Sequence, residues 1–237
     1  MGGGAMFVPP NPGFVRGYHL LPSEFALSDI ALRRIKVARL ADLNDPFEFI
    51  GANLGEKRIR EAVRGFKQDL HEKAGLLSFS KEWKSPVLWS HYAAKHRGMC
   101  LGFDMRQDQA MEVVYELERI LPQIDDIDGP NPSSTPEFVR RLLSTKYAHW
   151  SYEQELRVFV RLDETTKEDG LFYYAFSSDL VLRQVILGHS CEIPLERVRE
   201  LVRNIYGDEV RVFKARLAFK FFQVVSDERS LKVTAQS

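Results

Sequence analysis

The sequence predicts an α+β fold with a mixed or antiparallel split sheet and flanking helices. Helical and strand patterns are interleaved in the first half of the chain, whereas strands outnumber helices in the second half. No glycine-rich phosphate fingerprint follows a strand-like run, which disfavours a Rossmann or P-loop enzyme. We therefore expect a sheet that is not built from repeated strand–helix–strand units.

The composition is typical of a globular cytoplasmic protein. The chain has 237 residues, of which 44% are hydrophobic, enough for a sizeable core. Lys plus Arg and Asp plus Glu balance at 33 each, so no global attraction to nucleic acid or anionic membrane is expected. Only Cys100 and Cys191 occur, which indicates a reduced compartment rather than a disulfide scaffold. No apolar run approaches the length of a membrane span, so no membrane partner is predicted.

We expect a single domain over residues 14–237, preceded by a flexible leader at 1–13. The first five residues, MGGGA, lack the charged start and apolar stretch of a signal peptide. Residues 122–136 hold four prolines and several aspartates, which predicts a long surface loop inserted into the domain.

The first half of the chain shows alternating apolar patterns, helical patterns and proline stops. Phe14–Leu21 reads as a strand ended by Pro22, and Ser23 is a candidate N-cap for a helix reaching about Arg34. The patterns then predict, in order, a strand at Ile35–Leu40, a shaped turn at Asn44–Glu48, an amphipathic helix at Glu56–Ala74, and a strand, an aromatic helix and a strand within Gly75–Asp104.

The second half is dominated by strand patterns. Periodicity does not decide between strand and helix for Val113–Leu121. Beyond it the patterns predict helices at Glu137–His149 and Pro194–Tyr206, and strands at Glu155–Leu162, Leu171–Phe176, Leu182–Leu187, Val210–Ala215 and Leu217–Val225.

Gly75–Asp104 concentrates aromatic and titratable side chains. His91 and His96 are five residues apart, whereas a zinc-binding pair on a helix needs a spacing of three or four, and no CxxC is present. We therefore expect no metal site. Ser78 and Ser80 share one face of a strand, and His91 could act as a base, but the glycine elbow of a serine hydrolase is missing.

Glu153, Glu155 and Arg157 alternate along a strongly predicted strand and so share one face. They could be surface ion pairs, in which case they carry no function. Alternatively, carboxylates at the start of a strand, beside Trp150 and Tyr152, could bind a ribose or stabilise a cation. His19, next to Tyr18, is either a satisfied strand histidine or a hydrogen-bond partner for a ligand hydroxyl.

Four stretches together resemble one bacterial family that is catalogued as a domain of unknown function. They are NDPFE at Asn44–Glu48, SFS at Ser78–Ser80, LWSHYAAKHRGMCLGFD at Leu88–Asp104 and KYAHWSYEQELRVF at Lys146–Phe159. The resemblance spans roughly Tyr18 to Phe159. The chain departs from the family pattern at His19, where Arg is common, and at Leu156, where Tyr is preferred.

In the order of its parts, that family is similar to ADP-ribosyltransferases. The resemblance implies their split-sheet fold and an enzyme that uses NAD as a substrate, without a metal, to modify a macromolecular acceptor, protein or nucleic acid, as a toxin or phage-defence effector. It assigns catalysis to Glu155, Glu153 and His19. It assigns contacts with NAD to His19, Ser78, Ser80, Trp89, His91, Tyr92 and Arg157.

Two other interpretations stay open. The protein could be a non-catalytic module that binds a nucleotide or a protein through Trp89, His91 and Tyr92. It could also be a nuclease or hydrolase that uses His91 with Asp45 and Glu48. If Glu155 serves chemistry rather than folding, Glu155→Gln should leave stability nearly unchanged.

Overall fold

The computed structural model describes residues 10–121 and 136–231, and it confirms an α+β fold. The start of the predicted leader and nearly all of the predicted proline-rich loop lie outside these ranges. The described residues form two compact units. Unit 1 comprises 10–35, 79–110 and 175–231, and unit 2 comprises 36–78, 111–121 and 136–174. Among the described residues, no helix is both long enough and apolar enough to cross a membrane.

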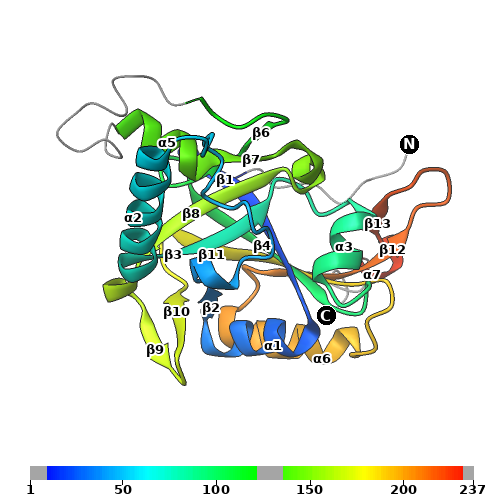
Figure 1. The fold of residues 1–237 in the computed structure, drawn as a ribbon. Helices are drawn as coiled ribbons and strands as arrows, with labels where there is room; N and C mark the ends of the chain where they lie inside the picture. The colour runs from blue at the N-terminus through cyan, green and yellow to red at the C-terminus, as the bar shows by residue number, and fades with distance from the viewer. Residues whose placement is uncertain (1–9, 122–135, 232–237) are drawn as a thin grey trace. The chain divides into compact units, whose positions relative to one another are not determined.

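Unit 1 contains a mixed sheet, labelled in Figure 1. Its strands in spatial order are β13 (Val224–Ser226), β12 (Arg211–Leu217), β11 (Leu180–Leu187), β4 (Met99–Arg106), β1 (Phe14–Leu21) and the end of β3 (Ala74–Ser80). The pairs β3–β1, β1–β4 and β4–β11 are antiparallel, and β11 and β12 are parallel. Strand β4 is buried along its length except at its last residue, which explains why Met99–Phe103 is apolar throughout rather than alternating; Asp104, which follows, is a buried ion-pair partner.

Four helices belong to unit 1. They are α1 (Ser23–Leu32), α3 (Pro86–Tyr92), α6 (Leu195–Tyr206) and α7 (Glu228–Leu231). Helices α1 and α6 lie side by side, and the Tyr206 hydroxyl donates to the Ile30 carbonyl over 2.8 Å. The prediction that Ser23 caps α1 is wrong. Pro22 holds the cap position, and the Ser23 hydroxyl instead donates to the Arg97 carbonyl.

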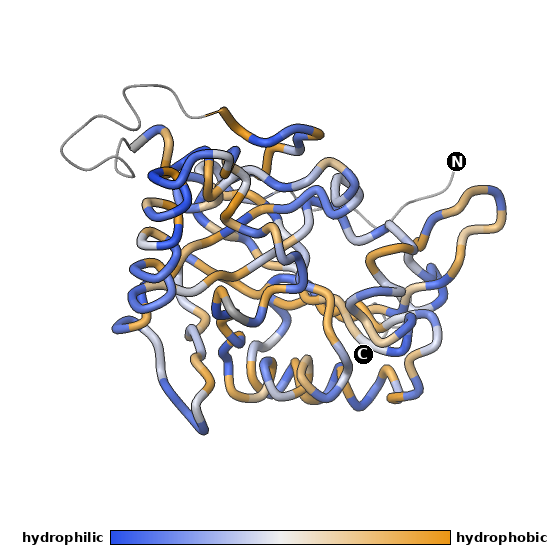
Figure 2. Tube along the Cα trace, viewed as in Figure 1, coloured by the Kyte–Doolittle hydropathy of each residue, from blue (hydrophilic) through white to orange (hydrophobic). Residues whose placement is uncertain are grey.

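The predicted strand at Leu217–Val225 is also wrong. Strand β12 ends at Leu217, and β13 begins only at Val224. The intervening hairpin is closed by the Ala218 N–H, which donates to the Gln223 carbonyl. This hairpin carries hydrophobic positions (Figure 2), and the rings of Phe219 and Phe222 are almost fully exposed. The apolar run therefore misled the prediction, because its side chains do not enter a core.

Unit 2 contains strands, two long helices and three 3-10 turns. In β-sheet order β3, β8 (Glu155–Arg161) and β5 (Met111–Glu112) are neighbours, β6 (Val114–Glu116) pairs with β7 (Thr145–Tyr147), and β9 (Thr166–Glu168) pairs with β10 (Leu171–Ala175). The short strand β2 (Arg34–Val37) lies where the chain passes from unit 1 into unit 2. The 3-10 turns are η1 (Leu40–Asp42), η2 (Ala148–Glu153) and η3 (Leu162–Glu164).

The helices α2 (Lys57–Lys73) and α5 (Pro136–Ser144) share a hydrophobic core. Ile59 and Val63 of α2 cluster with Phe138 and Leu142 of α5. The helix predicted at Glu137–His149 ends five residues early, because residues 145–147 pair as a strand with β6. Likewise, the strand predicted at Ile35–Leu40 gives way to η1 at Leu40.

Candidate functional site

The turn at Asn44–Glu48 directs one acidic side chain into the interior of unit 2. The Asp45 carboxylate accepts the Phe47 backbone N–H over 2.9 Å, and the Glu48 N–H donates to the Asp45 carbonyl over 3.0 Å. Such side-chain-to-backbone bonds are what fix an Asx turn. Phe49 follows with a φ of 58°, in the left-handed region, and is fully buried. The predicted shaped turn is therefore confirmed, and it delivers the Glu48 side chain to a buried position.

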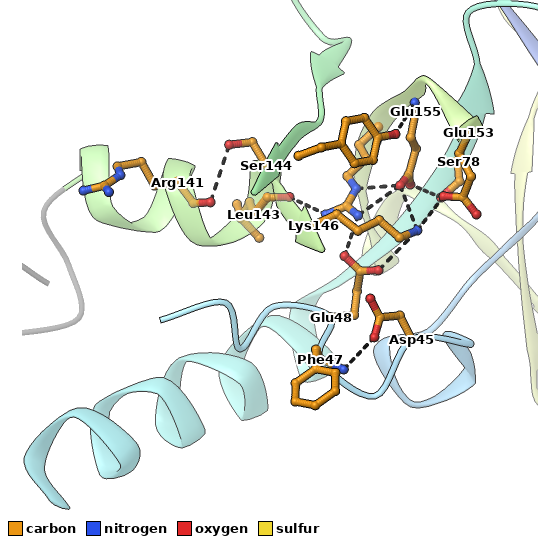
Figure 3. A network of polar contacts seen from close by, with 12 residues as sticks. Asp45, Phe47, Glu48, Ser78, Arg141, Leu143, Ser144, Lys146, Glu153 and Glu155 are labelled. Carbon is orange, nitrogen blue, oxygen red and sulfur yellow. Dashed lines mark hydrogen bonds and ion pairs between the residues drawn. The ribbon is translucent and has the colours of Figure 1, made fainter. Parts of the chain in front are cut away.

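Three carboxylates converge on the Lys146 ammonium, as Figure 3 shows. Lys146 Nζ lies 2.7 Å from Glu153 Oε2, 3.2 Å from Glu155 Oε2 and 3.5 Å from Glu48 Oε2. All four side chains are buried. A lysine held by three carboxylates keeps its charge, and their field raises the pKa of Lys146 against the opposing effect of its burial.

Arg157 forms the second cationic centre of this network, and its side chain is 0% exposed. Its guanidinium donates to both oxygens of Glu155, over 3.1 and 3.0 Å, and also to Glu48. A third nitrogen donates to the Leu143 carbonyl over 2.6 Å. The guanidinium also lies over the Phe49 ring, 5.1 Å from its centroid. Because the planar guanidinium donates in several fixed directions, these bonds hold Arg157 in one orientation, which a lysine ammonium could not achieve.

Glu155 receives four polar contacts and stays ionised. Besides Lys146 and Arg157, the Ser78 hydroxyl donates to Glu155 Oε1 over 2.8 Å. Burial alone would raise the pKa of Glu155, but Arg157 and Lys146 outweigh it and hold that pKa below its usual range. The Glu155 backbone N–H donates to the Tyr115 hydroxyl, and burial raises the pKa of Tyr115 to about 12.

Glu48 behaves in the opposite way. Its burial outweighs the attraction of Arg157 and Lys146, so its pKa is raised. Full ionisation of the network would set three carboxylates against two cations and leave one negative charge in excess. The network can therefore accept one more positive charge.

The structure brings Glu153, Glu155 and Arg157 together, but not as a row of surface ion pairs. All three are buried. Glu153 ends the 3-10 turn η2 rather than starting a strand, and Gln154 follows it with a φ of 45°. Because Glu155 holds two cations, its substitution is now expected to cost stability, contrary to the expectation from the sequence.

Lys146 and the pairing role of Glu48 were missed from the sequence. Both lie within stretches that carry the family resemblance, Glu48 in NDPFE and Lys146 at the start of KYAHWSYEQELRVF. Their adjacency was not visible, because Glu48 is 109 residues from its partner Arg157. The signal that could have identified them is that each is a charged residue within a motif that also contains apolar and aromatic residues.

His19 and Ser80 belong to unit 1, whereas Ser78, Glu153, Glu155 and Arg157 belong to unit 2. His19 is half-buried on β1, with its ring edge-on to Phe79 at a centroid distance of 5.9 Å. Ser80 is buried opposite Tyr18, and its hydroxyl accepts the Glu82 N–H. The assignment of His19 and Ser80 to NAD binding stays a prediction.

The aromatic helix α3 contributes mainly to the core of unit 1. Trp89 is fully buried, its indole N–H donates to the Trp83 carbonyl over 2.6 Å, and its ring stacks with that of His96. No face of Trp89 is open to a ligand in this structure. His91 is exposed and meets Tyr92 edge-on, so these two residues retain an accessible surface.

Two of the cavities in the described part of unit 2 have volumes of about 380 and 630 Å³. The smaller one is lined in part by Lys146, Phe47 and Tyr147. The larger one lies between η1, the Asn44–Glu48 turn and α2. Within residues 10–121 and 136–231, no group of three or more His, Cys, Asp or Glu side chains is placed to hold a metal ion.

Comparison with known proteins gave no match for this chain among family models, curated proteins or solved structures.

Proposed function

We propose that the protein is an ADP-ribosyltransferase-like enzyme that uses NAD to modify a macromolecular acceptor, with Glu155 as the carboxylate that stabilises the reacting ribose. The observation that supports this proposal is the polar setting of Glu155. A serine hydroxyl on β3 donates to it, and two cations keep it ionised. That setting matches the Ser and Glu pair that the family resemblance implies.

The chemistry explains why an ionised carboxylate is needed. When the bond between nicotinamide and ribose breaks, its electron pair leaves with the nicotinamide, which becomes neutral. The ribose is left with a positive charge shared by its anomeric carbon and ring oxygen. A fixed carboxylate nearby lowers the energy of that cation. The acceptor nucleophile then bonds to the anomeric carbon and loses its proton, for which Glu153 is the candidate base.

The charge balance of the network also supports the proposal. Its three carboxylates and two cations leave room for one more positive charge. A ribosyl cation would supply that charge. The Glu155 side chain is only 6% exposed, and Lys146 lines the 380 Å³ cavity while contacting Glu155. Substrate entering from this cavity would therefore have to displace Lys146.

The test is incubation of the purified protein with NAD labelled on its adenylate phosphate. Released nicotinamide is measured by chromatography, and label transfer is followed in mixtures of cellular protein or RNA. The wild type should release nicotinamide, and Glu155→Gln and Ser78→Ala should each release at least tenfold less, with folding of each verified by circular dichroism. Glu164→Gln, at an exposed position in η3, is the matched control and should behave as the wild type. Absence of nicotinamide release by the wild type with both acceptor mixtures would overturn the proposal.

A second candidate function is a non-catalytic binding module for a nucleotide or a protein. It is favoured by two features of Glu155. Both of its carboxylate oxygens already accept hydrogen bonds from Arg157, and its side chain is buried. Structural ion pairs have this form. The same assay separates the two functions, because a binding module would bind NAD or a protein without releasing nicotinamide.

A further inference from the structure

One face of helix α2 carries a stripe of four basic side chains. Arg60, Arg64, Lys67 and His71 follow one another at spacings of four, three and four residues. At 100° per residue they fall within an arc of about 60°, and they extend over about 16 Å of the helix. All four line the 630 Å³ cavity.

None of these four side chains is ion-paired with a carboxylate of the described residues. Arg60 donates to the carbonyls of Leu54 and Gly55, over 2.8 and 2.9 Å, and Lys67 donates to the Glu48 carbonyl over 3.1 Å. These bonds orient the cationic groups without neutralising them. Arg64 is exposed and lines the cavity, and its side chain makes no hydrogen bond or ion pair with the described residues.

The opposite face of the same helix behaves differently. Lys73 is paired with Asp69, four residues before it, and both lie about 120° or more around the helix from the nearest member of the stripe. Such pairs are the ordinary way in which a charged helix balances its surface. The positive charge on the cavity face is therefore not a general property of α2. It is confined to the face that meets a concave surface.

The opposite wall of the cavity is apolar. Leu40, Leu43 and Ile50 line it, together with the turn at Asp45 and Pro46. Asp45 is the one acidic residue of the lining, and its carboxylate accepts the Phe47 N–H. A volume of 630 Å³ lies within the range of sites for small molecules. The cavity thus offers several cationic donors on one side and an apolar surface on the other.

We propose that this cavity binds a small organic phosphate of the nucleoside diphosphate class. Its phosphates would be held by Arg60, Arg64 and Lys67, and its base would lie against the apolar wall. Arginine and lysine are the usual donors to phosphate, and charge-assisted bonds are the strong ones. A small ligand fits better than a nucleic acid, because the stripe is short and the net charge of the chain is zero.

This site is separate from the proposed NAD chemistry, since neither Glu153 nor Glu155 lines the cavity. Binding at α2 can therefore be present when turnover of NAD is absent, and the reverse also holds.

The test is isothermal titration calorimetry of the full chain with ADP, with inorganic pyrophosphate and with adenosine. ADP should bind more tightly than either of the other two, since it contacts both walls, and its affinity should fall between 50 and 200 mM salt because phosphate contacts are screened. Arg64→Gln should weaken ADP binding roughly tenfold or more, the usual effect of losing one charge-assisted hydrogen bond. Lys73→Gln, on the opposite, ion-paired face of the same helix, is the matched control and should leave ADP affinity unchanged.

Leu43→Ser provides a second arm, because it alters the apolar wall without changing charge. It should weaken ADP binding but leave pyrophosphate binding unaffected. Failure of ADP to bind would overturn the proposal, as would equal effects of Arg64→Gln and Lys73→Gln. Tight binding of a single-stranded RNA oligonucleotide by a protein that does not bind ADP would also overturn it, in favour of a nucleic-acid surface.

Discussion

Each unit of the molecule contains a buried cluster of charges, and the two clusters are built differently. In unit 1, Asp104 on β4 lies 2.5 Å from Arg16 Nε on β1 and 3.3 Å from Arg183 Nε on β11. These residues come from adjacent strands, and Arg16 is directly opposite Asp104 in the register of β1 and β4. In unit 2, the cluster gathers Glu48, Lys146, Glu153, Glu155 and Arg157 from a turn, a short strand, a 3-10 turn and a long strand.

The balance of charge and the access to water also differ. In the unit 1 cluster Arg16 and Arg183 both face Asp104, and Arg183 also lies 3.7 Å from Glu209. The Arg183 side chain is 30% exposed, so solvent and Glu209 share its charge. Three carboxylates face two cations in the unit 2 cluster, and the Arg157 side chain is 0% exposed. Removing charged groups from water is costly in both clusters. Only the unit 2 cluster lacks a solvent-exposed member, so its charges must be neutralised by one another. We infer that the unit 1 cluster is a set of cross-strand ion pairs that tolerates the loss of one partner. The stability of the unit 2 cluster, in contrast, depends on every one of its members.

The largest expected effect tests that dependence. Arg157→Met removes the guanidinium from between Glu48 and Glu155 and leaves buried carboxylates without their partner, which should lower the free energy of unfolding by about 3–5 kcal/mol. Urea denaturation followed by circular dichroism measures it. Arg161→Met, on the same strand but 71% exposed, should change stability by less than about 0.5 kcal/mol. Similar losses for the two variants would show that the network is not essential to unit 2.

A smaller effect is expected in unit 1. Asp104→Asn leaves Arg16 buried without its anion, but Arg183 can turn toward water, so the loss should be about 1–3 kcal/mol. The measurement is again urea denaturation. A loss as large as that of Arg157→Met would contradict the distinction between the two clusters.

Much of the fold could be predicted because local signals agreed with tertiary structure. Strand β1 has the predicted bounds, since Pro22 ends the strand-like run Phe14–Leu21, and α2 is within a residue of its prediction at both ends. The early end of α5 could not be predicted, because it depends on pairing of residues 145–147 with β6. The exposed hairpin around Phe219 was misread for the related reason that hydrophobicity does not report burial.

The candidate site was predictable only in part. The alternation of Glu153, Glu155 and Arg157 indicated a shared face, and the structure places them in one network. Lys146 and Glu48 join that network through contacts between segments distant in sequence, which no local period encodes. The unpaired stripe on α2 was also missed, because its meaning depends on which basic residues lack acidic partners in space.

Within the unit 2 cluster, the carboxylates should be unequal. Glu155 has a lowered pKa in the folded protein. Its contribution to the free energy of unfolding is therefore present above the pKa of the unfolded chain, near 4.5, and is lost as pH falls through the pKa of the folded protein. Glu48 has a raised pKa, so it favours folding most below that unfolded value and less as pH rises through the folded value. At pH 7, Glu155→Gln should therefore cost about 2 kcal/mol more than Glu48→Gln. Equal unfolding free energies for the two variants at pH 7 would contradict the opposite directions of these two pKa shifts.

The smallest effect concerns a buried carboxylate of unit 1 outside its cluster. Asp29 on α1 has no ion pair among the described residues, and burial raises its pKa to about 7 against the opposing effect of Arg34. A raised pKa on an acid means that the folded protein binds more protons than the unfolded chain between about pH 4 and pH 7, so stability falls as pH rises through this window. The slope reaches about 1.4 kcal/mol per pH unit. Asp29→Asn should flatten this slope in urea titrations at pH 5, 6 and 7, whereas Glu155→Gln should not. If the wild-type slope persists in Asp29→Asn, a group other than Asp29 takes up the proton in this pH range. Asp29 would then not differ from Glu155 in the way that its lack of an ion pair predicts.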